Sequence, residues 1–147
     1  MGRAPSPRFV VGYDGSPSSL AAVTEAARRA GPAGRLIVVH AYEPPPEALG
    51  WPLYESAARD AASGAQQCVD RLRGHPALEE VDWTAEVVAG PTAEVIDAAA
   101  RNLDADAIYI GSRGAGRASA LLGSVAHAVL HLADRPVTVI TERAAAA

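Results

Sequence analysis

Apolar residues along this chain gather in short runs that are separated by longer segments of helical period. Continuous runs of strand length are Phe9–Tyr13, Leu36–Ala41, Asp106–Ile110 and Pro136–Ile140. Apolar residues do not alternate with polar ones in Leu36–Ala41, which indicates burial on both faces, as in a parallel sheet. The run Val81–Val88 does alternate, and this is typical of a half-exposed strand at a sheet edge.

The intervals between these runs have the period and the boundary residues of helices. The first helix is expected to begin with Ser16 as its cap and Pro17 as its first residue, and to end at Gly31. A second is expected over about Glu55–Arg73. A third follows the turn Gly90-Pro91-Thr92 and carries Val95, Ile96, Ala99 and Leu103, and a fourth follows Gly123-Ser124 and carries Val125, Val129, Leu130 and Leu132. Five strands that alternate with four helices predict a single α/β domain, with a doubly wound, Rossmann-like parallel sheet and helices on two faces.

Pro44-Pro45-Pro46 predicts an extended loop after the second strand, running to about Tyr54. The length of 147 residues suits one domain, and we find no internal repeat and no linker.

The charged residues exclude several classes of function. The net charge is −4 and the basic residues are scattered, which argues against a nucleic-acid groove or a membrane anchor. All 13 residues counted as lysine or arginine are arginine. A Walker A phosphate loop and a Schiff-base enzyme both need a lysine, so both are excluded.

Cysteine usage and hydropathy predict the compartment. Cys68 is the only cysteine, so no intrachain disulfide can form, as expected in a reducing environment. The segment Met1–Arg8 lacks the apolar core of a signal peptide, and no apolar run approaches the roughly 20 residues of a membrane span. We therefore expect a cytoplasmic protein that does not bind membranes.

The segment from Gly111 to Ser124 is the first candidate for chemistry. Its glycines, at 111, 114, 116 and 123, would let backbone N–H groups approach a ligand closely, and Ser124 stands at a helix start that favours anions. Arg113 and Arg117 could supply positive charge. The alternative is an ordinary glycine-rich turn with a serine cap.

Two further candidates follow the first and second strands. Ligands of doubly wound sheets bind beyond the carboxyl ends of the strands at the switch point, where Asp14 would face the glycine loop. Asp14 could equally brace its own turn through Gly15 and Ser16. Backbone groups near Ala41 could read an adenine edge, whereas His40 is better explained by a local hydrogen bond.

Other reactive side chains favour no catalytic or metal site. His127 and His131 are four residues apart on one predicted helix, a spacing that can bind zinc, but no third ligand stands beside them in the sequence. We therefore interpret them as part of a polar helix face. Cys68 has no CxxC partner, and no G-x-S-x-G nucleophile motif is present.

Several of these motifs together resemble the universal stress protein family. The similar segments are Val10–Ser16, Val39–Ala41, Gly90-Pro91, Ile110–Gly114, Leu122–Val125 and Arg135–Ile140. ATP-binding members of that family carry the pattern G-2x-G-9x-G-(S/T). Gly111, Gly114, Gly123 and Ser124 match its marked positions, although only eight residues, 115–122, stand where the pattern has nine.

The resemblance implies a domain over residues 8–142, with flexible termini at 1–7 and 143–147, and the strand order 3-2-1-4-5. It implies ATP or another adenine nucleotide, with or without Mg²⁺, and a homodimer formed through the last strand, Pro136–Ile140. Asp14 and Ala41 would lie toward adenine and ribose. The residues implied to line the nucleotide are Gly12, Asp14, Ala41, Ile110, Gly111, Arg113, Gly114, Gly123, Ser124 and Val125.

Three functions are compatible with these features. The first is an ATP-binding stress-response or signalling module, at most a slow ATPase, since no general base is evident near the phosphates. The second is a family member that has lost nucleotide binding and acts as an interaction dimer, as the shortened spacing would suggest. The third, an enzyme that cleaves between the α and β phosphates, usually needs a further substrate domain.

Overall fold

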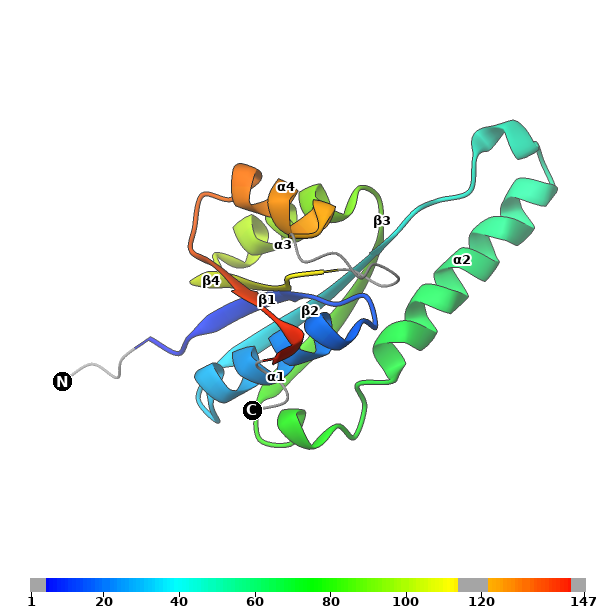
Figure 1. The fold of residues 1–147 in the computed structure, drawn as a ribbon. Helices are drawn as coiled ribbons and strands as arrows, with labels where there is room; N and C mark the ends of the chain where they lie inside the picture. Colours follow the sequence, from blue (N-terminus) through cyan, green and yellow to red (C-terminus); the bar gives the residue numbers. More distant parts are fainter. Residues whose placement is uncertain (1–4, 114–121, 144–147) are drawn as a thin grey trace.

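The computed structural model describes residues 5–113 and 122–143. Within these residues a five-stranded parallel sheet has the order β3-β2-β1-β4-β5 (Figure 1), which confirms the expected order. The strands are β1 (Arg8–Gly12), β2 (Arg35–Tyr42), β3 (Asp82–Ala89), β4 (Ala107–Gly111) and β5 (Val137–Ile140).

Helices cover both faces of this sheet. The helices are α1 (Pro17–Ala30), α2 (Leu53–Asp70), α3 (Thr92–Leu103) and α4 (Ser124–Leu132). Side chains of α1 and of the end of α2 share one core cluster with the sheet, and side chains of α3 and α4 share the other. Figure 1 shows α3 and α4 together on one side and α1 on the opposite side.

The central strand β1 is covered on both faces, which explains why its apolar run does not alternate. Val10 packs into the cluster beneath α3 and α4, whereas Val11 packs into the cluster beneath α1, and both are fully buried. A strand covered on both faces must be apolar at every position. Strand β3 lies at the sheet edge, as its alternating pattern predicted, but it is more exposed than the half-exposed strand expected, since none of its residues is buried.

The boundaries of α1 follow its capping residues. The Ser16 side chain accepts a hydrogen bond from the Ser19 N–H, Pro17 is the first helical residue, and Gly31 ends the helix with a φ of 62°. These boundaries are the ones that the sequence predicted.

Helix α2 differs from its prediction at both ends. It begins at Leu53 rather than Glu55, and a 3-10 turn, Glu47–Leu49, interrupts the segment expected to be an extended loop. It ends at Asp70 because the Arg73 N–H donates to the Asp70 carbonyl, only three residues back. Its first half extends away from the sheet (Figure 1).

Within the described ranges, no helix is both long and apolar enough to cross a membrane.

Candidate functional site

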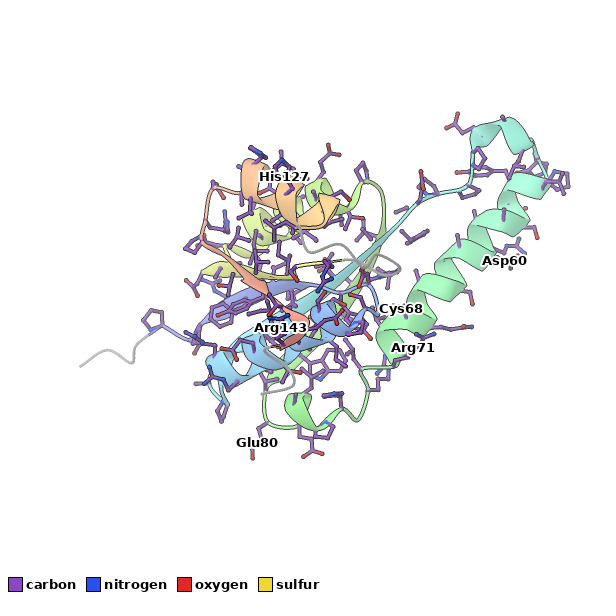
Figure 2. All side chains as sticks on the ribbon, in the orientation of Figure 1. Asp60, Cys68, Arg71, Glu80, His127 and Arg143 are labelled. Carbon is purple, nitrogen blue, oxygen red and sulfur yellow. The ribbon has the colours of Figure 1, made fainter. Side chains whose placement is uncertain are left out.

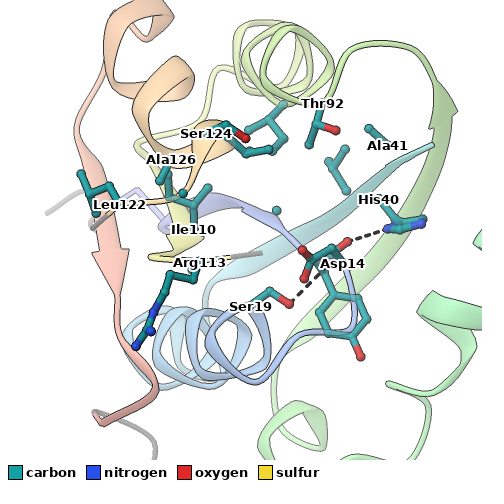
Figure 3. A pocket seen from close by; sticks show the side chains of 17 residues that line it. Asp14, Ser19, His40, Ala41, Thr92, Ile110, Arg113, Leu122, Ser124 and Ala126 are labelled. Carbon is teal, nitrogen blue, oxygen red and sulfur yellow. Dashed lines mark hydrogen bonds between the residues drawn. The ribbon is translucent and has the colours of Figure 1, made fainter. Parts of the chain in front are cut away.

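A cleft of about 440 Å³ opens at the carboxyl ends of β1, β2 and β4 (Figure 3). Strands β1 and β4 are neighbours, yet they lead to helices on opposite faces of the sheet. Such a change of direction is the topological switch point at which open α/β sheets bind ligands. The cleft therefore lies at the switch point, where the sequence analysis expected a ligand to bind.

Residues from six elements and their adjoining loops line this cleft. They are Gly12, Tyr13, Asp14, Ser19, Val39, His40, Ala41, Thr92, Ile96, Ile110, Gly111, Arg113, Leu122, Gly123, Ser124, Val125 and Ala126. Nine of the ten residues implied for the nucleotide are among them. The tenth, Gly114, lies outside the described residues, as do Gly116 and Arg117.

Two helix N-termini meet at the upper wall of the cleft in Figure 3, where Thr92 begins α3 and Ser124 begins α4. Neither helix has a side-chain hydrogen bond at its cap. The first N–H groups of a helix have no partner within the helix, and the dipole there is positive. This wall is thus suited to an anion.

Ser124 is not the cap that the alternative interpretation of this segment required. Gly123 is the cap, in an extended conformation, and Ser124 is the first helical residue. The Gly123 N–H donates to the Ser112 carbonyl at 2.7 Å, which holds Gly123 outside the helix.

The chain leaving β4 is fixed at its base by neighbouring elements. The Ser112 N–H donates to the Ile140 carbonyl at 2.8 Å, at the end of β5. The hydroxyls of Ser16 and Ser18 both donate to the Arg113 carbonyl. Helix α1 and strand β5 therefore set the position of the first residues of the glycine-rich segment.

Asp14 lies exposed at the lower wall of the cleft and braces its own turn. One carboxylate oxygen accepts from the Ser16 N–H at 2.9 Å, and the Asp14 N–H donates to the Ser19 hydroxyl at 3.3 Å (Figure 3). The bracing role, left open by the sequence, is thus observed, and it places the carboxylate beside the cleft.

Arg113 lines the cleft, but its guanidinium extends away from the centre (Figure 3). The side chain therefore does not supply the inward positive charge expected of it. The N-termini of α3 and α4 supply positive potential at the cleft.

His40 makes the local hydrogen bond that the sequence favoured. Its Nδ1 lies 2.7 Å from the Tyr13 carbonyl oxygen. Because a carbonyl oxygen can only accept, Nδ1 must carry the proton. This bond ties the carboxyl end of β2 to the turn that holds Asp14.

Several lining residues were not predicted from the sequence, among them Tyr13, Ser19, Thr92 and Leu122. Thr92 carried a detectable signal, since it follows a Gly-Pro turn and begins a helix after a strand. Tyr13 and Leu122 lie within the segments Val10–Ser16 and Leu122–Val125 singled out above, but nothing in the sequence marked their side chains as lining residues. Ser19 lies outside those segments and reaches the cleft through the packing of α1.

Burial changes the acidity of two groups near the cleft. It raises the pKa of the Tyr13 hydroxyl, and the nearby Cys68 thiol adds to this effect. Burial also raises the pKa of Cys68, with opposing contributions from Arg71, which lowers it, and Asp14, which raises it. Both groups are therefore held in their neutral forms.

No three histidine, cysteine, aspartate or glutamate side chains gather closely enough to hold a metal ion in the part of the chain that is described.

Comparison with known proteins was consistent with this geometry. The chain matches the universal stress protein family over residues 6–141. It is 37% identical to a universal stress protein of Thermus aquaticus, encoded in the 3' region of QAH/OAS sulfhydrylase, over 135 residues that cover 90% of this chain and 96% of the relative.

Two solved structures share the fold. A universal stress protein UspA from Lactobacillus plantarum is 23% identical, with a TM-score of 0.76, and 94% of this chain matches 99% of that one. A universal stress protein in complex with cAMP is 25% identical, with a TM-score of 0.61, and 95% of this chain matches 99% of that one.

Proposed function

The chain belongs to the universal stress protein family, and from this premise we propose that its cleft binds an adenine nucleotide, with ATP as the expected ligand. The protein would act as a nucleotide-dependent stress-response or signalling module. The observation that carries this proposal is the cleft at the switch point, whose wall is formed by the uncapped N-termini of α3 and α4.

The size and the composition of the cleft support a nucleotide. Its volume of about 440 Å³ falls within the range of small-molecule sites, which is roughly 300–1,000 Å³. The wall combines apolar side chains, such as Ile96 and Ile110, with polar ones, such as Asp14 and Ser124. A solved relative contains cAMP, which is itself an adenine nucleotide.

The two ends of the cleft suit different parts of the ligand. Asp14 and Ala41 would lie toward ribose and adenine, and Gly123 and Ser124 toward the phosphates, where helix N–H groups can donate. Mg²⁺ would be held chiefly by the phosphates and water, since Asp14 is the one acidic residue among the described lining residues.

Hydrolysis is expected to be slow or absent. Asp14 is already engaged by the Ser16 N–H, and no lysine is available in the chain to stabilise a transferring phosphoryl group. We expect any ATP turnover to lie below about 1 per second, the low end of ordinary enzymes. Phosphate release from purified protein measures it.

The direct test is a calorimetric titration with ATP and Mg²⁺, together with mass spectrometry of any nucleotide released on denaturation. We expect one site per chain. Ala41→Trp would fill the cleft and abolish binding, whereas Ala89→Trp, at an exposed position on β3 outside the cleft, would leave affinity unchanged.

Equal affinity in the two variants would contradict the site. No released nucleotide and no heat up to millimolar ATP would instead favour the interaction dimer, which the eight-residue spacing of 115–122 already suggests as the second function.

A further inference from the structure

Two histidines on the outer side of α4 form a pair that the proposed function does not use. His127 and His131 are both exposed, while Ala126 and Val129 of the same helix are buried against the sheet. Figure 2 shows His127 on the side of α4 turned away from the sheet. Both imidazoles are therefore accessible from solvent.

The two imidazole rings approach each other through their Nε2 atoms. Their Nε2 atoms lie 3.2 Å apart, and the rings meet edge to face with centroids 4.6 Å apart. In the metal-free protein this distance is a hydrogen bond, in which one Nε2 carries a proton and the other accepts it.

This distance between the two Nε2 atoms is close to the distance between two nitrogen ligands of one metal ion. Zinc–nitrogen bonds of about 2.0–2.1 Å place two tetrahedral ligands about 3.3–3.4 Å apart. Two ligands at right angles, as in square or octahedral coordination, lie about 2.9 Å apart. The observed 3.2 Å falls between these values, so the distance between the two nitrogens already suits a chelate.

We propose that His127 and His131 form a two-histidine chelate for one divalent transition-metal ion of the imidazole-preferring class, which comprises Zn²⁺, Ni²⁺ and Cu²⁺. The protons would then reside on the Nδ1 atoms, and water would complete the coordination. Since His131 stands in the last turn of α4, the negative end of the helix dipole also favours a cation.

The interpretation of these residues from sequence as a polar helix face rested on the lack of a third ligand. The described residues indeed hold no cluster of three, so the chelate is open, with exchangeable positions. Spacing alone could not show that the two Nε2 atoms come within hydrogen-bond distance, because each ring has several rotamers and two nitrogens.

The test is a calorimetric titration of the nucleotide-free, untagged full chain with Ni²⁺. We expect one ion per chain, and an affinity about 100-fold lower in His127→Gln, because the second imidazole acts at a high effective concentration. Line broadening by Cu²⁺ should centre on the amide signals of residues 124–132 of the unaltered chain.

A matched control keeps all four histidines and changes only their spacing. Combining His131→Leu with Leu132→His moves one ring about 100° around the helix, at a position that is exposed in both cases. We expect this variant to bind as weakly as His127→Gln, with an unchanged circular dichroism spectrum.

Affinity that is equal in the unaltered chain and in the two variants would overturn the proposal. So would broadening centred on His40 or His75, or no binding up to millimolar Ni²⁺.

Discussion

At the scale of single residues, Gly111 shows how closely the end of β4 approaches α1. A methyl group added there would lie 2.5 Å from the Ser18 hydroxyl and 2.7 Å from backbone atoms of Ser18 and Ser19. Backbone atoms cannot move aside as a flexible side chain can. The glycine is therefore required by packing, whether or not a nucleotide binds beside it.

We predict that Gly111→Ala lowers the free energy of unfolding by about 1–3 kcal/mol, the usual cost of overpacking. Urea denaturation measures it. The matched control is Gly64→Ala within α2, where the added methyl group meets nothing within 4 Å. Gly64→Ala should raise the free energy of unfolding by up to about 1 kcal/mol. If Gly64→Ala were less stable than Gly111→Ala, close packing against α1 would not explain the glycine at 111.

The reactivity of Cys68 reports the charges around it. Because burial and Asp14 raise the pKa of its thiol, alkylation by iodoacetamide at pH 8 should be slower than in the unfolded chain. Asp14→Asn should speed alkylation, because it removes a charge that raises the pKa of the thiol and so increases the thiolate fraction.

Arg71→Gln provides the opposite control, because Arg71 lowers the pKa of the same thiol. Cys68, in the last turn of α2, and Arg71, just after it, lie close together (Figure 2). Alkylation should slow in this variant. A change in the same direction for both variants would mean that access to the thiol, and not charge, controls its reactivity.

At the scale of elements, α1 ends in a surface ion-pair network. Glu25 pairs with Arg28 at 2.6 Å and with Arg29 at 2.9 Å. Hydrogen bonds from these two guanidinium groups lower the pKa of Glu25 from 4.5 to about 2. The network thus favours the charged carboxylate in the folded state.

The lowered pKa predicts a dependence of stability on pH. The Glu25 ion pairs contribute fully to the free energy of unfolding above about pH 4.5. This contribution is lost as the pH falls toward 2, because the Glu25 carboxylate takes up a proton at a higher pH in the unfolded chain than in the folded one. Glu25→Gln should cost at most about 1 kcal/mol near neutral pH, since the pair is solvent-screened, and this cost should shrink by pH 3.

Thermal denaturation of both proteins at pH 6 and pH 3 measures the effect. Glu80→Gln, at an exposed carboxylate that points into solvent (Figure 2), is the control. A cost that stays constant across this range would show that the ion pairs do not contribute.

At the scale of the whole molecule, β5 leaves one edge of the sheet without a neighbouring strand among the described residues. The carbonyls of Pro136 and Ile140 accept hydrogen bonds from the β4 side, from Ile108 and Ser112. Since backbone groups alternate along a strand, the N–H groups of Val137 and Val139 point outward. They are available to pair with a second copy, as the homodimer that the family resemblance implies would require.

We predict that the unaltered chain is a dimer and that Val139→Pro is a monomer, because the proline removes an outward N–H and leaves the β4 hydrogen bonds intact. Light scattering after size-exclusion chromatography measures the mass. Val139→Ala loses the side chain but keeps the N–H, so it should remain dimeric. A dimeric proline variant would place the interface elsewhere on the molecule.

Much of this architecture could be predicted from local patterns. Burial on both faces makes β1 and β2 continuously apolar, and the caps at Ser16 and Gly31 mark α1, because these signals depend on near neighbours in the chain. The same reasoning located Asp14, Gly111 and Gly123 beside the switch point. The family resemblance added the strand order.

The tertiary structure alone decided how those parts meet. The Ser18 hydroxyl reaches the Arg113 carbonyl across 95 positions of the chain, and Arg113 itself extends away from the cleft. Thr92 and Ser124 share a wall because α3 and α4 pack side by side on one face. Such contacts depend on how many side chains from distant parts of the chain pack together, and the spacing of residues along the sequence does not specify this packing.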